Sequence, residues 1–194
     1  AAAAELKAAK IDLIVSSDFI RTKETAELLK RELSLADSQI VFDERLREFN
    51  LGDLEGKLIE EYHAYFKSTR DKFVQGAPNG ESYHGLKLRM MAGLNDFEKT
   101  YQNKNILIIS HDTPLMMLYA GTKGFDLDQE IKLYEENGDF IRNGEVRPME
   151  FSLLPHNENY ELDFHRPYID EIVLTCGCLP AQAGGGEMRR IPEV

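Results

Sequence analysis

Short strand-forming runs alternate with helical patterns along this chain, and this alternation limits the fold more than any other feature. Apolar runs of strand length lie at residues 11–15, 40–42 and 105–110. Helical patterns lie between and around them, at residues 1–10, 19–33, 57–74, 81–101 and 114–120. Strands that alternate with helices usually pair in parallel, so the sequence predicts an α/β fold with a mostly parallel sheet.

The helix predicted at residues 19–33 follows Ser16-Ser17-Asp18, whose side chains can cap a helix start. Its apolar residues, among them Ile20, Ala26 and Leu28, fall roughly on one face. We therefore expect this helix to cover the sheet with that face.

The end of the α/β pattern predicts a domain boundary. After a polar stretch, a last strand is expected near residues 144–153. A linker-like segment follows, and then a tail with a run of three glycines. We predict one domain at residues 1–154 and a separate, irregular segment at 155–194.

Size and charge limit the partners that we expect. The 194 residues, 42% of them hydrophobic, suffice for one globular domain with an appendage. The formal charge of −11 disfavours broad contact with nucleic acid or anionic membranes and favours a small ligand. No apolar run reaches the roughly 20 residues of a membrane span, and no charged-then-apolar leader opens the chain. A cytoplasmic location without a membrane partner is the expectation.

The two cysteines, Cys176 and Cys178, predict neither a disulfide framework nor a strong metal site. One residue separates them, so a bridge between them would be strained. They resemble half of a zinc knuckle, but the chain has no second cysteine pair, and His165 is the nearest further candidate ligand. We expect no metal, with Cys176 and Cys178 as weak zinc candidates.

Polar residues follow each of the three strands, and the carboxyl ends of parallel strands share one edge of a sheet. Ser17 and Arg21 follow the first strand, Glu48 the second and His111 the third. An arginine at a helix start binds phosphate oxygens, a buried carboxylic acid can protonate a leaving oxygen, and an imidazole can stabilise developing charge. These residues predict a site for phosphoryl transfer, with Ser17 as a further phosphate contact. Phosphoryl transfer also requires a nucleophile such as a second histidine.

Each of these residues also has an ordinary structural interpretation. His111 could be a hydrogen-bonded histidine at a strand end, and Arg21 and Glu48 could be charges on solvated faces. Glu81 and Ser82 either begin a helix, with Ser82 as its cap, or line the pocket as secondary residues. The convergence of the loops favours a site for the first three.

Four segments in order resemble the histidine phosphatase superfamily, which includes phosphoglycerate mutases and related small phosphatases. They are residues 14–26, residues 45–56 with Arg45-Leu46-Arg47-Glu48, Asn79-Gly80-Glu81-Ser82, and Ser110-His111. The resemblance implies a three-layer α/β/α sandwich over residues 1–153 and a small phosphorylated substrate, without a cofactor. It also implies that Arg21 and His111 bind the phosphoryl group and that Glu48 donates the proton.

The sequence departs from this family at the nucleophile. The family carries it in an Arg-His-Gly motif after a central first strand, and this motif does not occur here. The resemblance therefore implies that the central strand is missing, that ladder hydrogen bonds of two neighbouring strands are unmade, and that this chain alone is inactive.

The tail resembles a different family. Leu162-Asp-Phe-His-Arg-Pro-Tyr-Ile-Asp and Arg189-Arg-Ile-Pro-Glu-Val are similar to segments of the catalytic domain of isoleucyl-tRNA synthetases. Our main hypothesis is a fragment of such a synthetase with an inserted phosphatase-like domain, which implies ATP and tRNA for the parent only. The alternatives are a stand-alone phosphatase or phosphoglycerate mutase-like enzyme, and a non-catalytic insertion that contacts an anion or tRNA.

Overall fold

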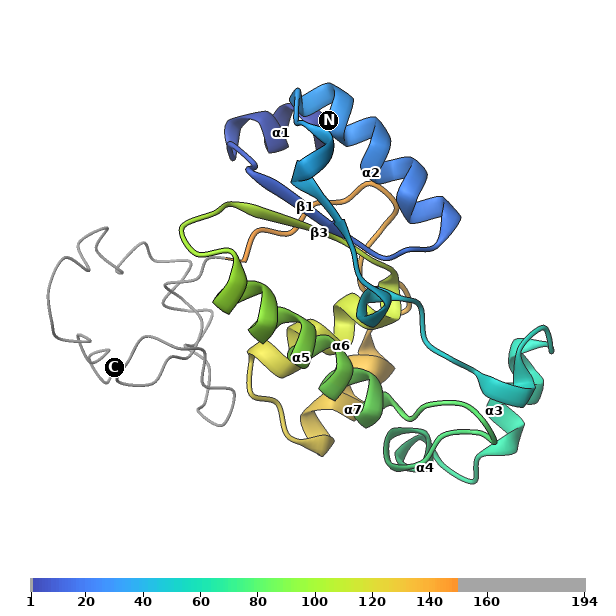
Figure 1. Cartoon of the computed structure of the whole chain (residues 1–194). Helices are drawn as coiled ribbons and strands as arrows, with labels where there is room; N and C mark the ends of the chain where they lie inside the picture. Colours follow the sequence, from blue (N-terminus) through green and yellow to red (C-terminus); the bar gives the residue numbers. More distant parts are fainter. Residues whose placement is uncertain (1, 150–194) are drawn as a thin grey trace, which may run out of the picture.

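The fold is built on a parallel sheet of three strands in the order β2-β1-β3 (Figure 1). The structure, a computed structural model, describes residues 2–149. The strands are β1 (Leu13–Ser16), β2 (Ile40–Phe42) and β3 (Ile106–Ile109). All three predicted strands are therefore present, and the mostly parallel sheet is confirmed.

Strand β1 forms the centre of the sheet because it pairs on both of its edges. Its residue Ile14 lies opposite Ile40 of β2 and Leu107 of β3. All four residues of β1 are buried, as expected for a central strand of apolar and β-branched side chains. The order β2-β1-β3 leaves the second edge of β3 without a strand among residues 2–149, and the expectation of unmade ladder hydrogen bonds beside a missing strand stays a prediction.

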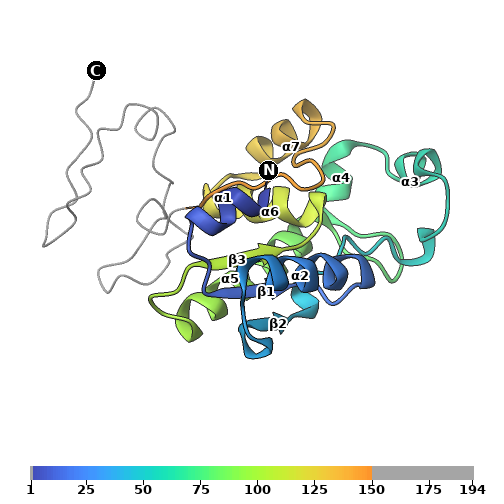
Figure 2. The same ribbon diagram turned by 90° about the horizontal axis from the view of Figure 1, so that it is seen from above.

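Helices cover both faces of the sheet, which confirms the three-layer α/β/α architecture (Figures 1 and 2). One face carries α1 (Ala2–Ala8) and α2 (Ile20–Leu33). The other carries α5 (Tyr83–Thr100), α6 (Asp112–Thr122) and α7 (Leu127–Glu136), with the predicted Pro114 in the first turn of α6. Most of the buried core lies on this second side, where Leu86, Met90 and Met117 are almost completely enclosed.

The segment predicted as one helix at residues 57–74 consists of two short helices, α3 (Ile59–Tyr65) and α4 (Thr69–Val74). The chain is extended at Phe66, and Ser68 begins α4 by accepting a hydrogen bond from the backbone of Asp71 at 3.2 Å. A serine favours a helix start over a helix interior because its hydroxyl can bind the backbone. This capping explains the break.

Helix α2 is less amphipathic than its sequence predicts. Thr22 and Ala26 are its buried residues, whereas Ile20 and Leu28 are 78% and 53% exposed. Its N-cap is Phe19, which makes no side-chain cap hydrogen bond, so the predicted cap by Ser16–Asp18 is wrong. The sheet has three strands within residues 2–149, which limits the helix surface that these strands can cover.

The end of the described chain holds a helix that the sequence did not predict. Helix α7 lies in the stretch that was expected only to be polar, and Asp126 caps it by accepting a hydrogen bond from the backbone of Gln129. Residues 144–149 form no strand, and residues 150–153 of the strand expected there lie outside the described residues. The expected boundary at residue 154 and the tail at 155–194 lie outside the described residues. No helix in residues 2–149 is long and apolar enough to span a membrane.

Candidate active site

The segments that follow the three strands meet at one edge of the sheet. The backbone ladder extends one residue beyond β1, where Ser17 donates to the carbonyl of Ile109 and the Asp43 amide donates to Ser16. The hydroxyl of Ser110 donates to the carbonyl of Leu46 at 2.8 Å, which ties the end of β3 to the loop after β2. The side chains that project from this edge are therefore held close together.

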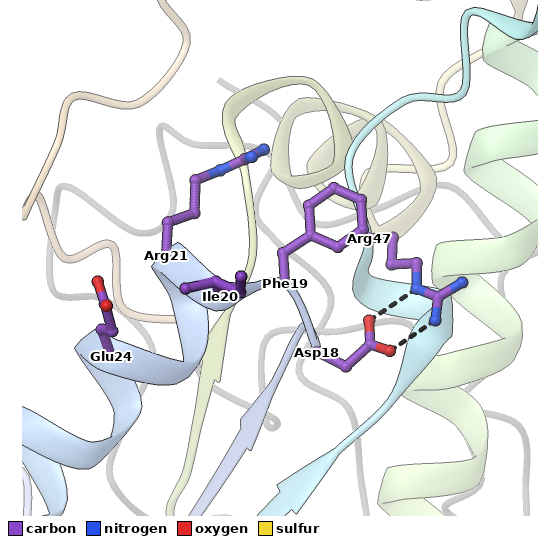
Figure 3. Close-up of a pocket in the computed structure, with 6 residues that line it drawn as sticks. All are labelled: Asp18, Phe19, Ile20, Arg21, Glu24 and Arg47. Carbon is purple, nitrogen blue, oxygen red and sulfur yellow. Dashed lines mark hydrogen bonds and ion pairs between the residues drawn. The ribbon is translucent and has the colours of Figure 1, made fainter.

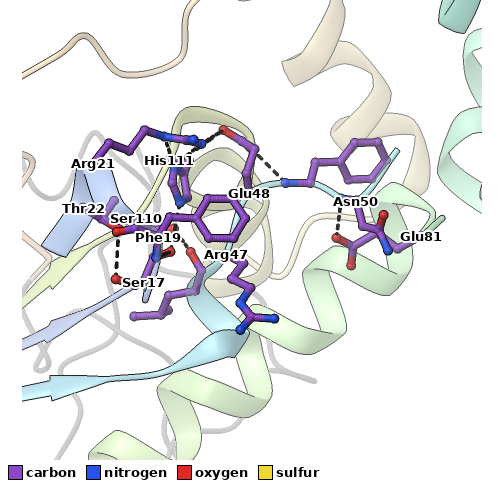
Figure 4. A network of polar contacts seen from close by, with 12 residues as sticks. Ser17, Phe19, Arg21, Thr22, Arg47, Glu48, Asn50, Glu81, Ser110 and His111 are labelled. Atoms are coloured by element: carbon purple, nitrogen blue, oxygen red, sulfur yellow. Dashed lines mark hydrogen bonds and ion pairs between the residues drawn. The ribbon is translucent and has the colours of Figure 1, made fainter. Parts of the chain in front are cut away.

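Arg21, Glu48 and His111 form one cluster at this edge (Figure 4). The guanidinium of Arg21 donates to Nδ1 of His111, with its terminal nitrogen at 2.8 Å. The same nitrogen lies 3.6 Å from a carboxylate oxygen of Glu48, which is 3.7 Å from Nδ1. Arg21 lies in the first turn of α2 and His111 is the N-cap of α6, so the positive ends of two helices meet here.

The hydrogen bonds of His111 define its tautomer. A guanidinium can only donate, so Nδ1 accepts, and Nε2 carries the proton that it donates to the hydroxyl of Ser17 at 3.0 Å. Burial, followed by the positive charges of Arg21 and Arg89, lowers the pKa of His111 to about 4. The imidazole is therefore neutral at pH 7, and its contact with Glu48 is not an ion pair.

The lowered pKa predicts a pH-dependent stability. The unfolded chain binds a proton at this histidine near pH 6.5, whereas the folded chain resists it until about pH 4. The stabilisation is thus complete above pH 6.5 and is lost as the pH falls towards 4, by up to about 3 kcal/mol. Urea unfolding of the wild type and of His111→Gln across this window measures the effect.

The substitution His84→Gln is the matched control, because His84 is exposed on the first turn of α5. This variant should keep the pH dependence that His111→Gln loses. Equal pH dependence in the wild type and in His111→Gln would contradict the assigned tautomer and charge.

Glu48 has the environment of a proton donor. Burial raises the pKa of its carboxyl group. The hydrogen bond from the backbone of Phe49 and the positive charge of Arg21 act in the opposite direction but do not outweigh burial. A raised pKa keeps more of the acid protonated near neutral pH, as general acid catalysis requires. The Glu48 carboxyl group also lies at the rim of a pocket, where it can reach a bound molecule.

Two adjoining pockets open at this edge. One, of about 550 Å³, is lined by Asp18, Phe19 and Arg21 together with Ile20, Glu24 and Arg47 (Figure 3). The other, of about 600 Å³, extends from Arg21 past Glu48 towards α5. Phe19 lies in both pockets, its ring in edge contact with His111 and within 5.1 Å of the Arg21 guanidinium carbon. The aromatic ring is therefore a wall beside the cluster.

Arg89 on α5 holds the loop that carries Glu48. Its guanidinium donates to the carbonyls of Arg45 and Arg47 at 2.5 and 3.0 Å and to that of Glu48 at 3.4 Å. Glu81 binds the same guanidinium through both oxygens, at 2.6 and 3.1 Å. These contacts fix the backbone on either side of the acid.

Glu81 and Gly52 complete the anchoring of this loop. A carboxylate oxygen of Glu81 accepts from the backbone of Asn50 at 2.9 Å. Gly52 has φ +59° and lies so close to the carbonyl of Pro78 that a Cβ would overlap it. The left-handed conformation and the close approach both require glycine.

Replacing Arg89 by methionine is expected to destabilise the fold by about 3 kcal/mol. The substitution leaves the partly buried carboxylate of Glu81 and three loop carbonyls without their hydrogen-bond donor. Urea unfolding measures the loss. Arg70→Met is the matched control, since the pair of Arg70 with Asp128 is exposed on both sides and such pairs contribute less than about 1 kcal/mol. Equal stability of the two variants would contradict the anchoring role.

The other predicted site residues orient His111, cap helix α5 or line the larger pocket. Ser17 is fully buried and its hydroxyl faces the imidazole, which orients His111; its predicted phosphate contact stays a prediction. Ser82 caps α5 by accepting from the backbone of Gly85 at 3.0 Å, and Glu81 lines the larger pocket. The sequence interpretation missed Arg89, although a single arginine among Leu88, Met90 and Met91 was a signal for it.

In residues 2–149, no group of three or more histidine, cysteine, aspartate or glutamate side chains is placed to hold a metal ion. Cys176, Cys178 and His165 lie outside the described residues, so the weak zinc candidates stay untested.

The fold and the cluster define a class of α/β proteins that hold a ligand at the carboxyl ends of parallel strands. Residues 1–142 match the model of the histidine phosphatase superfamily (branch 1), and the chain belongs to this superfamily.

Relatives and solved structures agree with this assignment. The chain is 33% identical over 129 residues to the probable phosphoglycerate mutase GpmB of Escherichia coli K12, covering 64% of this chain and 59% of that protein. It thus spans less than two thirds of the curated relatives it matches. Bacillus stearothermophilus YhfR is 26% identical, with a TM-score of 0.57 and coverage of 66% and 65% of the two chains. A mycobacterial glucosyl-3-phosphoglycerate phosphatase, 22% identical over 68% and 66%, has the same fold with a TM-score of 0.58.

The hypothesis of an isoleucyl-tRNA synthetase fragment is wrong. The superfamily match spans most of the chain, and the proteins named above include a probable phosphoglycerate mutase and a glucosyl-3-phosphoglycerate phosphatase, without a synthetase among them. These findings favour the alternative, a phosphatase or phosphoglycerate mutase-like enzyme. They give no support to tRNA as a partner.

Proposed function

We propose that this edge binds the phosphoryl group of a small phosphate monoester and that the protein transfers or hydrolyses it. The observation that carries the proposal is the position of Arg21, whose 60% exposed side chain lies at the meeting of two helix N-termini. A guanidinium and backbone N–H groups at helix starts are preferred partners of phosphate oxygens. The curated relative, a probable phosphoglycerate mutase, supports a phosphate ester as ligand.

The cluster can perform two tasks of phosphoryl transfer. Arg21 neutralises and orients the phosphoryl oxygens, and Nδ1 of His111 can donate to them once the bound dianion raises the pKa of the imidazole and Nδ1 takes up a proton. An attacking nucleophile, which these residues do not supply, forms the new bond to phosphorus as the P–O bond to the alcohol breaks, and Glu48 gives its proton to the leaving oxygen and becomes a carboxylate. The Arg-His-Gly motif is absent from the printed sequence, and we assign these residues binding and proton donation, not nucleophilic attack. The proposed reaction requires no cofactor.

Titration of the purified protein with inorganic phosphate in a calorimeter tests the binding step. We expect one site per chain at pH 7, and competition by vanadate, which presents similar oxygens. Because the printed sequence lacks the Arg-His-Gly nucleophile, release of phosphate from phenyl phosphate is measured on a version of the protein that carries such a nucleophile. Absence of phosphate binding would overturn the proposal.

A further inference from the structure

Among residues 2–149, the wall of the larger pocket has no excess of positive charge. Its charged residues are four arginines and four glutamates: Arg21, Arg45, Arg47, Arg89, Glu44, Glu48, Glu55 and Glu81. A phosphoryl dianion together with a second anionic group would need several uncompensated cations there. The partners of each arginine therefore decide how many anions the pocket accepts.

Arg45 is bound by two carboxylates. It lies 2.7 Å from Asp43 and 2.5 Å from Asp96, and a further bond from its Nε to Asp43 measures 3.0 Å. The hydrogen bonds to Asp43 and Asp96 stabilise the positive charge of Arg45 and therefore raise the pKa of its guanidinium above the ordinary value. Arg45 is thus not available to a second anion.

Arg47 and Arg89 are paired in the same way. Arg47 makes two parallel bonds to the carboxylate of Asp18, at 2.7 and 2.6 Å (Figure 3). Arg89 is bound to both oxygens of Glu81 and to loop carbonyls. Bidentate arginine–carboxylate pairs are the strongest of their kind, so an incoming carboxylate would have to displace one to gain a contact.

Arg21 differs from the other three. Its hydrogen bonds go to a neutral imidazole, and its carboxylate neighbour Glu48 is 3.6 Å away. Beyond the cluster the wall is acidic. Glu44 lies 3.6 Å from Arg47, whose charge is already paired with Asp18, and Glu55 makes no ion pair within residues 2–149. Of the four arginines of this wall, Arg21 alone has no hydrogen bond to a carboxylate of residues 2–149, and it matches one phosphoryl group.

We propose that the site selects phosphate monoesters whose alcohol carries no second negative charge, and that it disfavours phosphoglycerates. This inference rests on the proposed function and narrows its substrate class. The phosphoryl group lies against Arg21, and the alcohol extends along Phe19 towards Glu44 and Glu55, where a carboxylate is repelled. An uncharged or positively charged alcohol meets no such repulsion.

Glycerol 3-phosphate and 3-phosphoglycerate are the matched probes. They differ at one group, which is an uncharged hydroxymethyl group in the first and a carboxylate in the second. Calorimetric competition with phosphate at low salt should show glycerol 3-phosphate binding about fivefold more tightly, the size of one unfavourable charge contact near a protein surface. Raising the salt concentration should reduce this ratio, because exposed charges are screened.

The substitution Asp18→Asn releases Arg47 and should shift the ratio towards 3-phosphoglycerate. Asp37→Asn is the control, because it removes the same charge from the exposed pair with Lys30, away from the pocket, and should leave the ratio unchanged. If Asp18→Asn fails to fold, the comparison of the two esters on the wild type still tests the proposed selectivity.

Equal or tighter binding of 3-phosphoglycerate by the wild type would overturn this inference alone. Binding of neither ester would overturn the proposed function and this inference with it. A ratio that Asp18→Asn and Asp37→Asn change equally would also contradict the assignment to Arg47.

Discussion

Replacing Arg21 by glutamine is expected to weaken phosphate binding by about 100-fold, because two charge-assisted hydrogen bonds of roughly 1.5 kcal/mol each are lost. Arg21 is the arginine of the pocket that is not hydrogen-bonded to a carboxylate among the described residues. The substitution should also raise the pKa of His111, since Arg21 is one of the charges that lower it. Calorimetry and histidine NMR measure the two effects.

The substitution Arg31→Gln is the matched control for this experiment. Arg31 lies in the last turn of the same helix, is exposed, and donates to the carbonyl of Glu27. It should leave both the affinity and the pKa of His111 unchanged. If the two variants lose phosphate affinity equally, net charge rather than the Arg21 geometry explains the binding.

Replacing Glu48 by glutamine should produce opposite effects on binding and turnover. Phosphate binding tightens several-fold, because a negative charge 3.6 Å from Arg21 is removed. In a version of the protein that carries the nucleophile, turnover of phenyl phosphate falls by about 10²–10⁴, the usual contribution of a general acid. The fall should be smaller for p-nitrophenyl phosphate, whose leaving group needs less protonation. Steady-state kinetics with both esters measures the difference.

Glu32→Gln controls for the loss of a carboxylate, because Glu32 pairs with Lys7 at 3.7 Å on an exposed part of α2. It should leave turnover of both esters intact. An equal loss for both esters in Glu48→Gln would indicate that Glu48 supports the fold of the site and donates no proton.

The strand pattern alone was sufficient to predict the sheet. Leu13–Ser16 and Ile106–Ile109 are short runs of branched apolar residues, and such runs have few alternatives to a buried strand. Helix positions were harder to predict. Ile20 and Leu28 are apolar by sequence yet exposed, and Ile20 lines the smaller pocket. Helix α7 was not predicted, because its many charged residues were interpreted as a polar stretch and the N-cap at Asp126 was not recognised.

The candidate site divides in a similar way. Residues that follow strands directly, such as Ser17 and His111, could be placed together because strand ends share an edge. Arg89 could not be placed, since its three carbonyl partners belong to a loop about forty residues earlier, and only the folded chain brings them near. The charge pairing of Asp18 with Arg47 likewise depends on tertiary structure.

The most direct test is an NMR titration of the histidine side chains with inorganic phosphate at pH 7. Of the five histidines in the chain, His111 should shift and saturate at the dissociation constant that calorimetry gives, and Arg21→Gln should abolish the shift. The bound dianion should raise the pKa of His111 from its low value. Phosphate that binds without changing the His111 resonances, or that shifts His63 or His84 instead, would contradict phosphoryl binding at this edge.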